Sequence, residues 1–152
     1  MTAPDPSPMQ LALDQARAAG ERGEVPVGAV IVDAATGHVL AAAGNRAEEL
    51  ADPTAHAEML AIREAAAAAG RPRLDGFDLY VTLEPCAMCA AAMALARVRK
   101  LVFGAYDPKM GGVEHGPCVF RQPTCHHRPE VVGGVHESEA AALLKQFFKA
   151  KR

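Results

Sequence analysis

The stretch FDLYVTLEPCAMCAAAMALAR, residues 77–97, indicates a strand that leads directly into a helix. Its first seven residues form a largely apolar run with the length of a buried strand. Pro85 suits the first turn of a helix, and the alanine-rich remainder continues that helix. A buried strand followed by a helix is the repeating unit of α/β folds.

The segments on either side of this unit alternate between the same two patterns. We predict helices over residues 9–23, 53–70 and 137–152, and strands over residues 25–33, 37–45, 100–105 and 130–135. Thr54 suits the N-cap of the second helix and Gly70 its end. The residues AATG, 34–37, join the first two strands as an antiparallel hairpin. This order predicts one mixed five-stranded sheet with helices on both faces, a three-layer α/β/α fold.

Length and composition favour a single globular domain. The chain has 152 residues, of which 50% are hydrophobic and 22% charged, and this is enough to bury a core. Residues 1–7 are predicted to be disordered, which leaves residues 8–152 for the domain. No run reaches the roughly 18 apolar residues of a membrane span, and no secretory signal is visible. We therefore expect a cytoplasmic protein with no membrane partner.

Charge does not identify a partner, whereas the cysteines indicate chemistry. The formal net charge is -2 at pH 7, so the molecule as a whole does not attract nucleic acid, although a local basic patch can do so. Four cysteines in a reducing compartment favour metal binding or catalysis over disulfides. Only Cys86 and Cys89 have the C-x-x-C spacing.

A histidine and a glutamate complete a candidate zinc site. The segment DPTAHAEML, residues 52–60, places His56 and Glu58 at the head of a predicted helix. Helix starts at one end of an open α/β sheet can meet, which brings His56 to Cys86 and Cys89. Two thiolates and one imidazole leave one position of a tetrahedral zinc ion open for a water of lowered pKa. Glu58 would exchange protons with that water.

Each part of this site also has an ordinary explanation. A single C-x-x-C can be a redox pair or half of a structural zinc site, and His56 or Glu58 alone can be a helix-surface residue. A structural site would need a fourth protein ligand, and the chain would then be a zinc module without catalysis. The residues that could supply this ligand are His115, Cys118, Cys125, His126 and His127.

The joint pattern of HAE, residues 56–58, and PCAMC, residues 85–89, resembles the signature of the zinc-dependent cytidine and deoxycytidylate deaminases. Further segments are similar to the bacterial tRNA adenosine deaminases of that superfamily: EVPVGAVIV, GNR, LVFGAYDPK and HHRPEVVGGV. The resemblance covers residues 8–152. It implies a cytidine-deaminase-like fold, one Zn²⁺ per subunit and conversion of the wobble adenosine of a tRNA anticodon to inosine.

The resemblance also implies roles for single residues. Zinc would be bound by His56, Cys86 and Cys89. Hydroxide from the zinc water would attack C6 of adenine, while Glu58 would protonate the ring nitrogen and then the leaving amino group.

Further positions match residues that bind the substrate in the family. They are Asn45, Ala57, Leu83, Glu84 and Asp107. Asn45 would help to hold the flipped nucleoside. Backbone groups of Ala57 and of the Leu83–Glu84 segment would line the pocket, and Asp107 would lie beside the neighbouring anticodon nucleotides.

Two contacts with other molecules are implied as well. The terminal residues FFKAKR, 147–152, resemble the aromatic and basic end of the family helix that touches RNA. Phe147 and Phe148 can equally pack in the core, and the basic residues can be a solvated face. The resemblance implies a homodimer whose active sites are completed across the interface. The alanine-rich helix after Pro85 suits packing against a partner subunit or within one chain.

The segment MGGVEHGPCVFRQPTC, residues 110–125, departs from the family, which has a small Gly-, Ala- and Ser-rich loop there. His126 also stands where the family usually has asparagine. These positions lie near the substrate in the family fold. A deaminase of free nucleosides or bases, such as cytosine, guanine or adenosine derivatives, is therefore the alternative to an enzyme acting on a tRNA anticodon stem-loop. Glu114 or His115 would then close the pocket over a small molecule.

Overall fold

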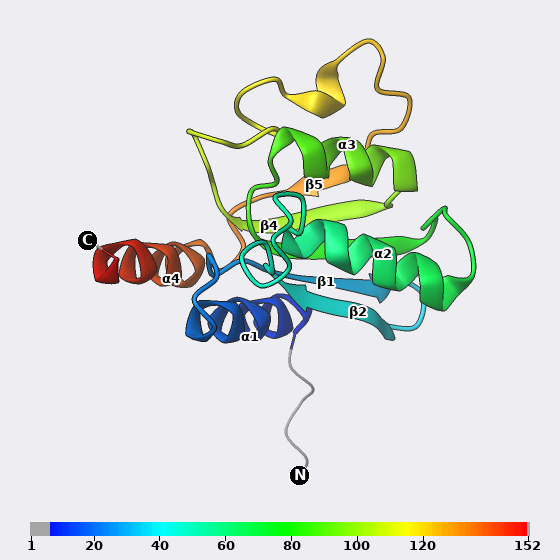
Figure 1. Ribbon diagram of the computed structural model, residues 1–152. Helices are drawn as coiled ribbons and strands as arrows, with labels where there is room; N and C mark the ends of the chain where they lie inside the picture. Colours follow the sequence, from blue (N-terminus) through cyan, green and yellow to red (C-terminus); the bar gives the residue numbers. More distant parts are fainter. Residues whose placement is uncertain (1–6, 152) are drawn as a thin grey trace.

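A mixed sheet forms the middle layer of the protein, for which the computed structural model describes residues 7–151 (Figure 1). Its strands are β1 (Gly28–Asp33), β2 (Val39–Gly44), β3 (Phe77–Leu83), β4 (Lys100–Ala105) and β5 (Glu130–Val132), in the order β2-β1-β3-β4-β5. β1 is antiparallel to both β2 and β3, whereas β3, β4 and β5 are mutually parallel. The predicted hairpin and the mixed five-stranded sheet are confirmed.

Helices cover both faces of the sheet. The helices are α1 (Pro8–Glu21), α2 (Ala57–Ala69), α3 (Ala87–Ala96) and α4 (Glu137–Ala150), with a short 3-10 turn, η1 (Val119–Arg121), between β4 and β5. α1 and α4 pack on one face, and α2 and α3 pack on the other (Figure 1). The predicted three-layer α/β/α fold is confirmed.

The central strands supply both cores. Successive residues of a strand point to opposite faces, so Ile31 of β1 packs in the core beneath α2 and α3, whereas Val30 and Val32 pack in the core beneath α1 and α4. β1 is buried along nearly its whole length. This two-sided burial explains why its sequence is a continuous apolar run rather than an alternating one.

α2 begins three residues after the predicted N-cap. Its N-cap is His56, and the prediction of Thr54 is wrong. Thr54 instead donates its hydroxyl and its backbone N–H to Oδ1 of Asp52, at 2.7 and 2.8 Å. These bonds make a turn ahead of the helix. The end of α2 is confirmed, because Gly70 has the left-handed conformation (φ 69°) of a helix C-cap.

α3 also begins later than its sequence pattern suggests. Cys86 is its N-cap, so Pro85 precedes the helix rather than lying in its first turn. Neither Cys86 nor His56, the N-cap of α2, uses its side chain to cap its own helix. Both side chains are therefore free to meet between the two helix starts.

The remaining boundaries differ by a few residues. α1 ends at Glu21, and β5 covers only the first half of the predicted strand over 130–135. Ser7 caps α1 by accepting a hydrogen bond of 3.2 Å from the backbone N–H of Gln10. Disorder is predicted for residues 1–7, of which residues 1–6 lie outside the described residues, and the domain limits stay a prediction. Over residues 7–151, no helix has the length and apolar character needed to cross a membrane.

Candidate metal centre and active site

Three strands end at one edge of the sheet and bring the candidate site together. β2 is antiparallel to β1, which is antiparallel to β3, so β2, β3 and β4 all point the same way. Asn45, Glu84 and Asp107 follow the ends of these three strands. α2 and α3 begin at this edge. Ligand sites of open α/β sheets form at such an edge.

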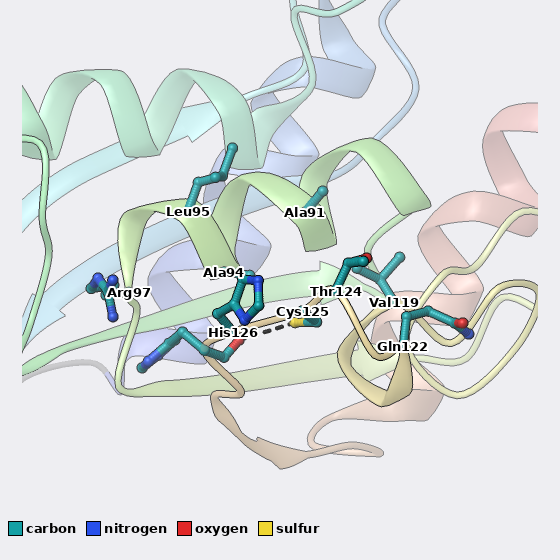
Figure 2. A pocket seen from close by; sticks show the side chains of 10 residues that line it. Ala91, Ala94, Leu95, Arg97, Val119, Gln122, Thr124, Cys125 and His126 are labelled. Carbon is teal, nitrogen blue, oxygen red and sulfur yellow. Dashed lines mark hydrogen bonds between the residues drawn. The ribbon is translucent and has the colours of Figure 1, made fainter.

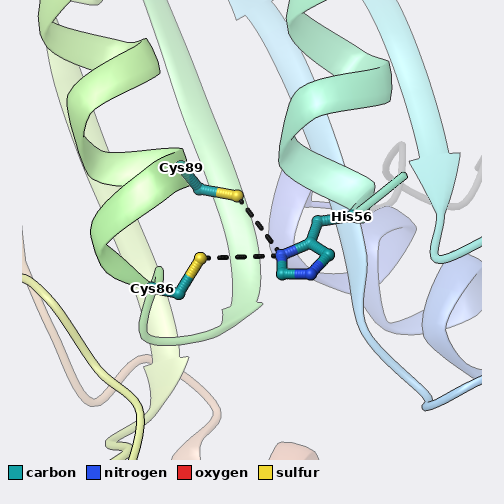
Figure 3. A group of neighbouring side chains, drawn as sticks. All are labelled: His56, Cys86 and Cys89. Atoms are coloured by element: carbon teal, nitrogen blue, oxygen red, sulfur yellow. Dashed lines mark hydrogen bonds between the residues drawn. The ribbon is translucent and has the colours of Figure 1, made fainter. Parts of the chain in front are cut away.

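His56, Cys86 and Cys89 form a compact cluster between the starts of α2 and α3 (Figure 3). Nδ1 of His56 lies 3.6 Å from Sγ of Cys86 and 3.6 Å from Sγ of Cys89. All three candidate ligand atoms lie within 4.8 Å of one another. Cys89 is buried, whereas His56 and Cys86 are half-buried.

These distances fit a tetrahedral zinc ion. With Zn–S of about 2.3 Å and Zn–N of about 2.0–2.1 Å, tetrahedral angles place the sulfur and nitrogen ligands about 3.6 Å apart. Both observed S···N distances have this value. The spacing of His56 from both cysteines therefore fits a bound zinc ion.

The electrostatics of the cluster also favour a cation. A hydrogen bond from Cys89 lowers the pKa of Cys86 to about 4. The same interaction and burial raise the pKa of Cys89, and contact with Cys86 raises the pKa of His56. The cluster thus favours a thiolate at Cys86, which is the form that binds a metal cation. Binding of a divalent cation would displace the remaining protons, because thiolates and neutral imidazole are the ligand forms.

Glu58 lies next to the cluster without belonging to it. It is the second residue of α2 and is 4% exposed. Its carboxylate is not among the clustered ligand atoms. Burial raises the pKa of Glu58 to about 7, and a divalent cation beside it would lower that value again. A carboxyl group in this range can both accept and release a proton near neutral pH.

Asn45 joins the end of β2 to the start of α2. Its Oδ1 accepts a hydrogen bond of 2.7 Å from the backbone N–H of Ala57, the first residue of the helix. Because Oδ1 is used as the acceptor, the amide NH2 of Asn45 remains as a donor. The backbone N–H of Ala57 is occupied by this contact.

The other predicted substrate residues lie at the ends of β3 and β4. Leu83 is half-buried and pairs with Ala105. The backbone N–H of Glu84 donates to the carbonyl of Ala105 at 2.8 Å. Asp107 is half-buried, and its Oδ1 accepts the backbone N–H groups of Lys109 (3.2 Å) and Met110 (3.0 Å).

No fourth protein ligand joins the cluster among residues 7–151. The residues considered for that role lie elsewhere or have other partners. Nδ1 of His115 is hydrogen-bonded to Glu84, and Nε2 of His127 is hydrogen-bonded to the carbonyl of Val98. The thiols of Cys118 and Cys125 donate to the carbonyls of His115 and His127, respectively. His126 lines a hollow beside α3 (Figure 2). The donor set therefore leaves room for water or substrate on a bound metal.

Two buried carboxylates near the site go beyond what the sequence predicts. Glu24 is 2% exposed and accepts the backbone N–H groups of Glu48 (3.1 Å) and Glu49 (2.8 Å), which holds the turn after Asn45. Burial alone would raise the pKa of Glu84, but several hydrogen bonds bring its pKa below the usual value. An acidic residue directly beside an apolar strand segment, such as Glu24 before VPVGAV, is the sequence signal for this role.

Known proteins are similar to this chain in sequence. Residues 3–105 match the family model described as the cytidine and deoxycytidylate deaminase zinc-binding region. The tRNA-specific adenosine deaminase of Agrobacterium fabrum is 60% identical over 144 residues, which cover 95% of this chain and 93% of that protein. The protein of the same name from Bacillus subtilis is 47% identical and covers 95% of this chain and 88% of its own length.

Solved structures agree with these relatives. A structure from work on A-to-I editing by tRNA:A34 deaminases at the wobble position is 59% identical, with a TM-score of 0.87 over 90% of this chain and 98% of that chain. A guanine deaminase from Nitrosomonas europaea is 25% identical, with a TM-score of 0.80 over 92% of this chain and 82% of that chain.

The chain belongs to the zinc-binding cytidine and deoxycytidylate deaminases, and within them to the branch of the tRNA-specific adenosine deaminases. It is a zinc-dependent hydrolytic deaminase. The alternative of a zinc module without catalysis is wrong.

Proposed function

We propose that this protein converts the wobble adenosine of a tRNA anticodon to inosine, with one zinc ion per subunit. One observation carries the proposal, namely the 60% identity with a tRNA-specific adenosine deaminase over 95% of the chain. Two guanine deaminases of known structure are less similar, with 25% identity over 92% of this chain and 37% over 65% of it. The substrate assignment therefore follows the RNA-modifying relatives.

His56, Cys86 and Cys89 hold the metal in this proposal. Zinc bound at these side chains would supply hydroxide near neutral pH, because it lowers the pKa of a bound water. Cys89 is buried and Cys86 is half-buried, so the protein covers the site most completely at Cys89. The imidazole of His56 fixes the metal to the other helix.

Glu58 carries the protons of the reaction. Hydrolysis consumes one water and releases one ammonia, so a proton must move from the attacking water to the ring nitrogen and another must reach the leaving amino group. A single buried carboxyl group can do both in turn. The position of Glu58, two residues after His56 and outside the ligand cluster, supports this role.

Asn45 orients the nucleoside through its amide NH2. Adenosine offers oxygen and ring-nitrogen acceptors, and the Oδ1 atom of Asn45 is already used by Ala57. A side chain held by its own acceptor presents its donor in a defined direction. The backbone near Leu83 and the side chain of Asp107 lie at the same edge and would line the path of the RNA.

The competing substrate class, a free base, loses part of its support. It would require Glu114 or His115 to close over a small molecule. Glu114 instead pairs with Arg121 at 2.9 Å, and His115 is bonded to Glu84 at 2.8 Å. Glu114 is thereby engaged by η1, and His115 by the residue that follows β3.

The C-terminal helix supports an RNA partner. Phe148 of α4 is 50% exposed, and its ring lies 5.3 Å from that of Phe147. Nζ of Lys151 lies 5.0 Å from the centre of the Phe147 ring. Exposed aromatic rings with basic side chains are groups that bind single-stranded nucleotides. An enzyme with a tRNA substrate would work in the cytoplasm, where we place this protein.

We also propose that the enzyme is a homodimer that associates through α3. Leu95 is 82% exposed on this helix. With Ala91 and Ala94 it lines a largely apolar hollow, closed on its other side by residues 119–127 (Figure 2). We infer that a second copy of this chain packs into the hollow. Because α3 also carries Cys89, a partner subunit in the hollow would lie next to the active site. Exposed apolar surface of this kind is typical of association sites.

Inosine and ammonia formation by the zinc-loaded protein tests the substrate. The substrates are an anticodon stem-loop with adenosine at the wobble position, the same stem-loop with guanosine there, and free adenosine, guanine and cytosine. We expect turnover of the adenosine stem-loop alone, and none by Glu58→Gln. Turnover confined to a free base would refute the tRNA assignment and leave the zinc chemistry intact.

A further inference from the structure

The side chain of Glu84 is 0% exposed and gathers one loop around its carboxylate. Oε1 accepts a hydrogen bond from the backbone N–H of Asp107 at 3.0 Å and contacts Nδ1 of His115 at 2.8 Å. Oε2 accepts the backbone N–H groups of Val113 (3.3 Å), Glu114 (2.9 Å) and His115 (3.2 Å). Five contacts from one loop use the full acceptor capacity of a carboxylate.

The loop is shaped to fit this carboxylate. A Cβ atom at Gly111 would lie 2.4 Å from Oε2 of Glu84 and 2.5 Å from the carbonyl oxygen of Asp107. Only glycine therefore lets the backbone approach the carboxylate so closely. The unusual segment after Lys109 is thus built around Glu84 and is not an unstructured insertion.

The same loop is tied to the metal cluster. Gly111 forms an isolated β-bridge with Cys86, one of the candidate zinc ligands. The backbone N–H of Gly112 donates to the carbonyl of Pro85 at 2.8 Å. The position of residues 106–115, here called the rim loop, is therefore set relative to Cys86.

The rim loop carries the exposed groups at this edge of the site. Tyr106 is 41% and Met110 65% exposed, and Asp107 lies between them in the sequence. The side chain of His115 is 33% exposed. A carboxylate only accepts hydrogen bonds, so Nδ1 of His115 must carry a hydrogen to bond to Glu84. Nε2 of His115 then remains available for other partners.

We propose that Glu84 is a positioning residue for the substrate, acting through its side chain. It holds the rim loop against the start of α3 and so sets where Tyr106, Asp107 and Met110 meet the RNA. The proposal rests on the proposed function, since it takes RNA as the substrate. It is distinct from the backbone contact that the sequence predicts at Glu84, because the carboxylate faces the loop.

A second buried carboxylate provides the matched control. Asp78 lies at the opposite end of β3 and is 4% exposed. It accepts two hydrogen bonds from Arg99, at 2.8 and 2.7 Å. Asp78→Asn therefore tests the loss of a buried carboxylate in the same strand, away from the active-site edge.

The test compares Glu84→Gln with Asp78→Asn in the zinc-loaded protein. A glutamine keeps the size of the side chain but turns one acceptor oxygen into a donor that faces other donors. We expect unchanged zinc content and amide hydrogen exchange in the rim loop at least about tenfold faster. We expect KM for the stem-loop at least about tenfold higher with kcat within about threefold, the pattern of lost binding. Asp78→Asn should lower Tm without changing KM.

Gly111→Ala provides an independent variant if Glu84→Gln does not fold. It keeps the carboxylate but pushes the rim loop away from it, and it should also raise KM. Unchanged exchange in the rim loop of Glu84→Gln, or an equal rise of KM in Asp78→Asn, would overturn the proposal. A fall of kcat alone would do so as well. Hydrogen exchange needs no substrate. If the wild type does not deaminate the stem-loop, that result therefore counts against the proposed function and not against the role of Glu84 in holding the rim loop.

Discussion

Oδ1 of Asn45 accepts a hydrogen bond of 2.7 Å from the backbone N–H of Ala57. The side chain of His56, the N-cap of α2, does not bond to the free backbone N–H groups at the start of its helix. Asn45, which follows β2, thus accepts one of these N–H groups in its place. The imidazole of His56 is thereby released for the metal cluster. One amide side chain thus joins the end of β2 to the helix start beside the metal ligand, and in the proposed function its NH2 group binds the substrate.

Asn45→Asp separates these roles, because aspartate keeps the acceptor and removes the amide donor. We expect a Tm close to that of the wild type, since carboxylates cap helix N-termini well. We expect kcat/KM roughly tenfold lower, the effect of losing about one hydrogen bond. Asn45→Ala should also lower the free energy of unfolding by about 1 kcal/mol. Wild-type kcat/KM in Asn45→Asp would show that the amide does not bind substrate.

Glu58→Gln tests the proton carrier with a side chain of equal size. Glu58 is outside the ligand cluster, so zinc should stay at one ion per chain. The turnover number on the stem-loop should fall at least about 100-fold, because general acid–base catalysis commonly contributes this much. Zinc content by atomic absorption serves as the control. Activity within about tenfold of the wild type would mean that another group moves the protons.

The four cysteines divide into two matched pairs. Cys86→Ser and Cys89→Ser should lose zinc and activity, since a serine hydroxyl is a poorer zinc ligand than a thiolate. Cys118→Ser and Cys125→Ser should retain both, because their thiols contact backbone carbonyls. A chelator should lower the Tm of the wild type more than that of Cys86→Ser. Full zinc content in either serine variant of the first pair would contradict the ligand assignment.

The metal ligands could be predicted from the sequence because their geometry is mostly local. Cys86 and Cys89 lie three residues apart at one helix start, and α2 and α3 begin at the same edge of the sheet. The central strands could be predicted because two-sided burial requires continuous apolar runs. His56 lies 30 residues before Cys86, so its prediction as a ligand also needed the common end of the sheet at which both helices begin.

The helix starts and the rim loop could not be predicted in the same way. The group that accepts the first N–H of α2 comes from Asn45, twelve residues earlier. The preference of threonine for N-cap positions therefore pointed to Thr54, which is not the N-cap. The side-chain contacts of Glu84 reach residues 23 to 31 positions away. A buried carboxylate reveals its partners only once the chain is folded.

Asp52 and Thr54 provide a pH test of the turn that precedes His56. Hydrogen bonds from the hydroxyl and the backbone N–H of Thr54 lower the pKa of Asp52 below its usual 3.8. Thr54→Val removes the hydroxyl, so the pKa measured by NMR should rise toward 3.8, whereas Thr54→Ser should keep it low. A group whose pKa is lower in the folded than in the unfolded state stabilises the protein at pH values above its unfolded-state pKa. This stabilisation is lost as the pH falls through the folded-state pKa. The stability advantage over Thr54→Val should therefore shrink below about pH 3.8. An unchanged pKa in Thr54→Val would argue against the hydroxyl contact.

Leu95→Glu tests whether α3 forms the dimer interface. At 82% exposure, Leu95 contributes little to the fold of one subunit, so its replacement should leave Tm and zinc content nearly unchanged. Within an interface, the new carboxylates would be desolvated without partners, which opposes association. We expect a dimeric wild type and a monomeric variant in light scattering coupled to size-exclusion chromatography.

Val39→Glu is the control for this substitution. Val39 is 38% exposed and is the first residue of β2. β2 is one edge strand of the sheet, and β5 is the opposite edge strand. The Val39→Glu variant should remain dimeric. If a partner subunit completes each active site, the Leu95→Glu monomer should keep its zinc and lose most of its turnover, and raising the protein concentration should restore part of it. A dimer that survives Leu95→Glu would place the interface on another face.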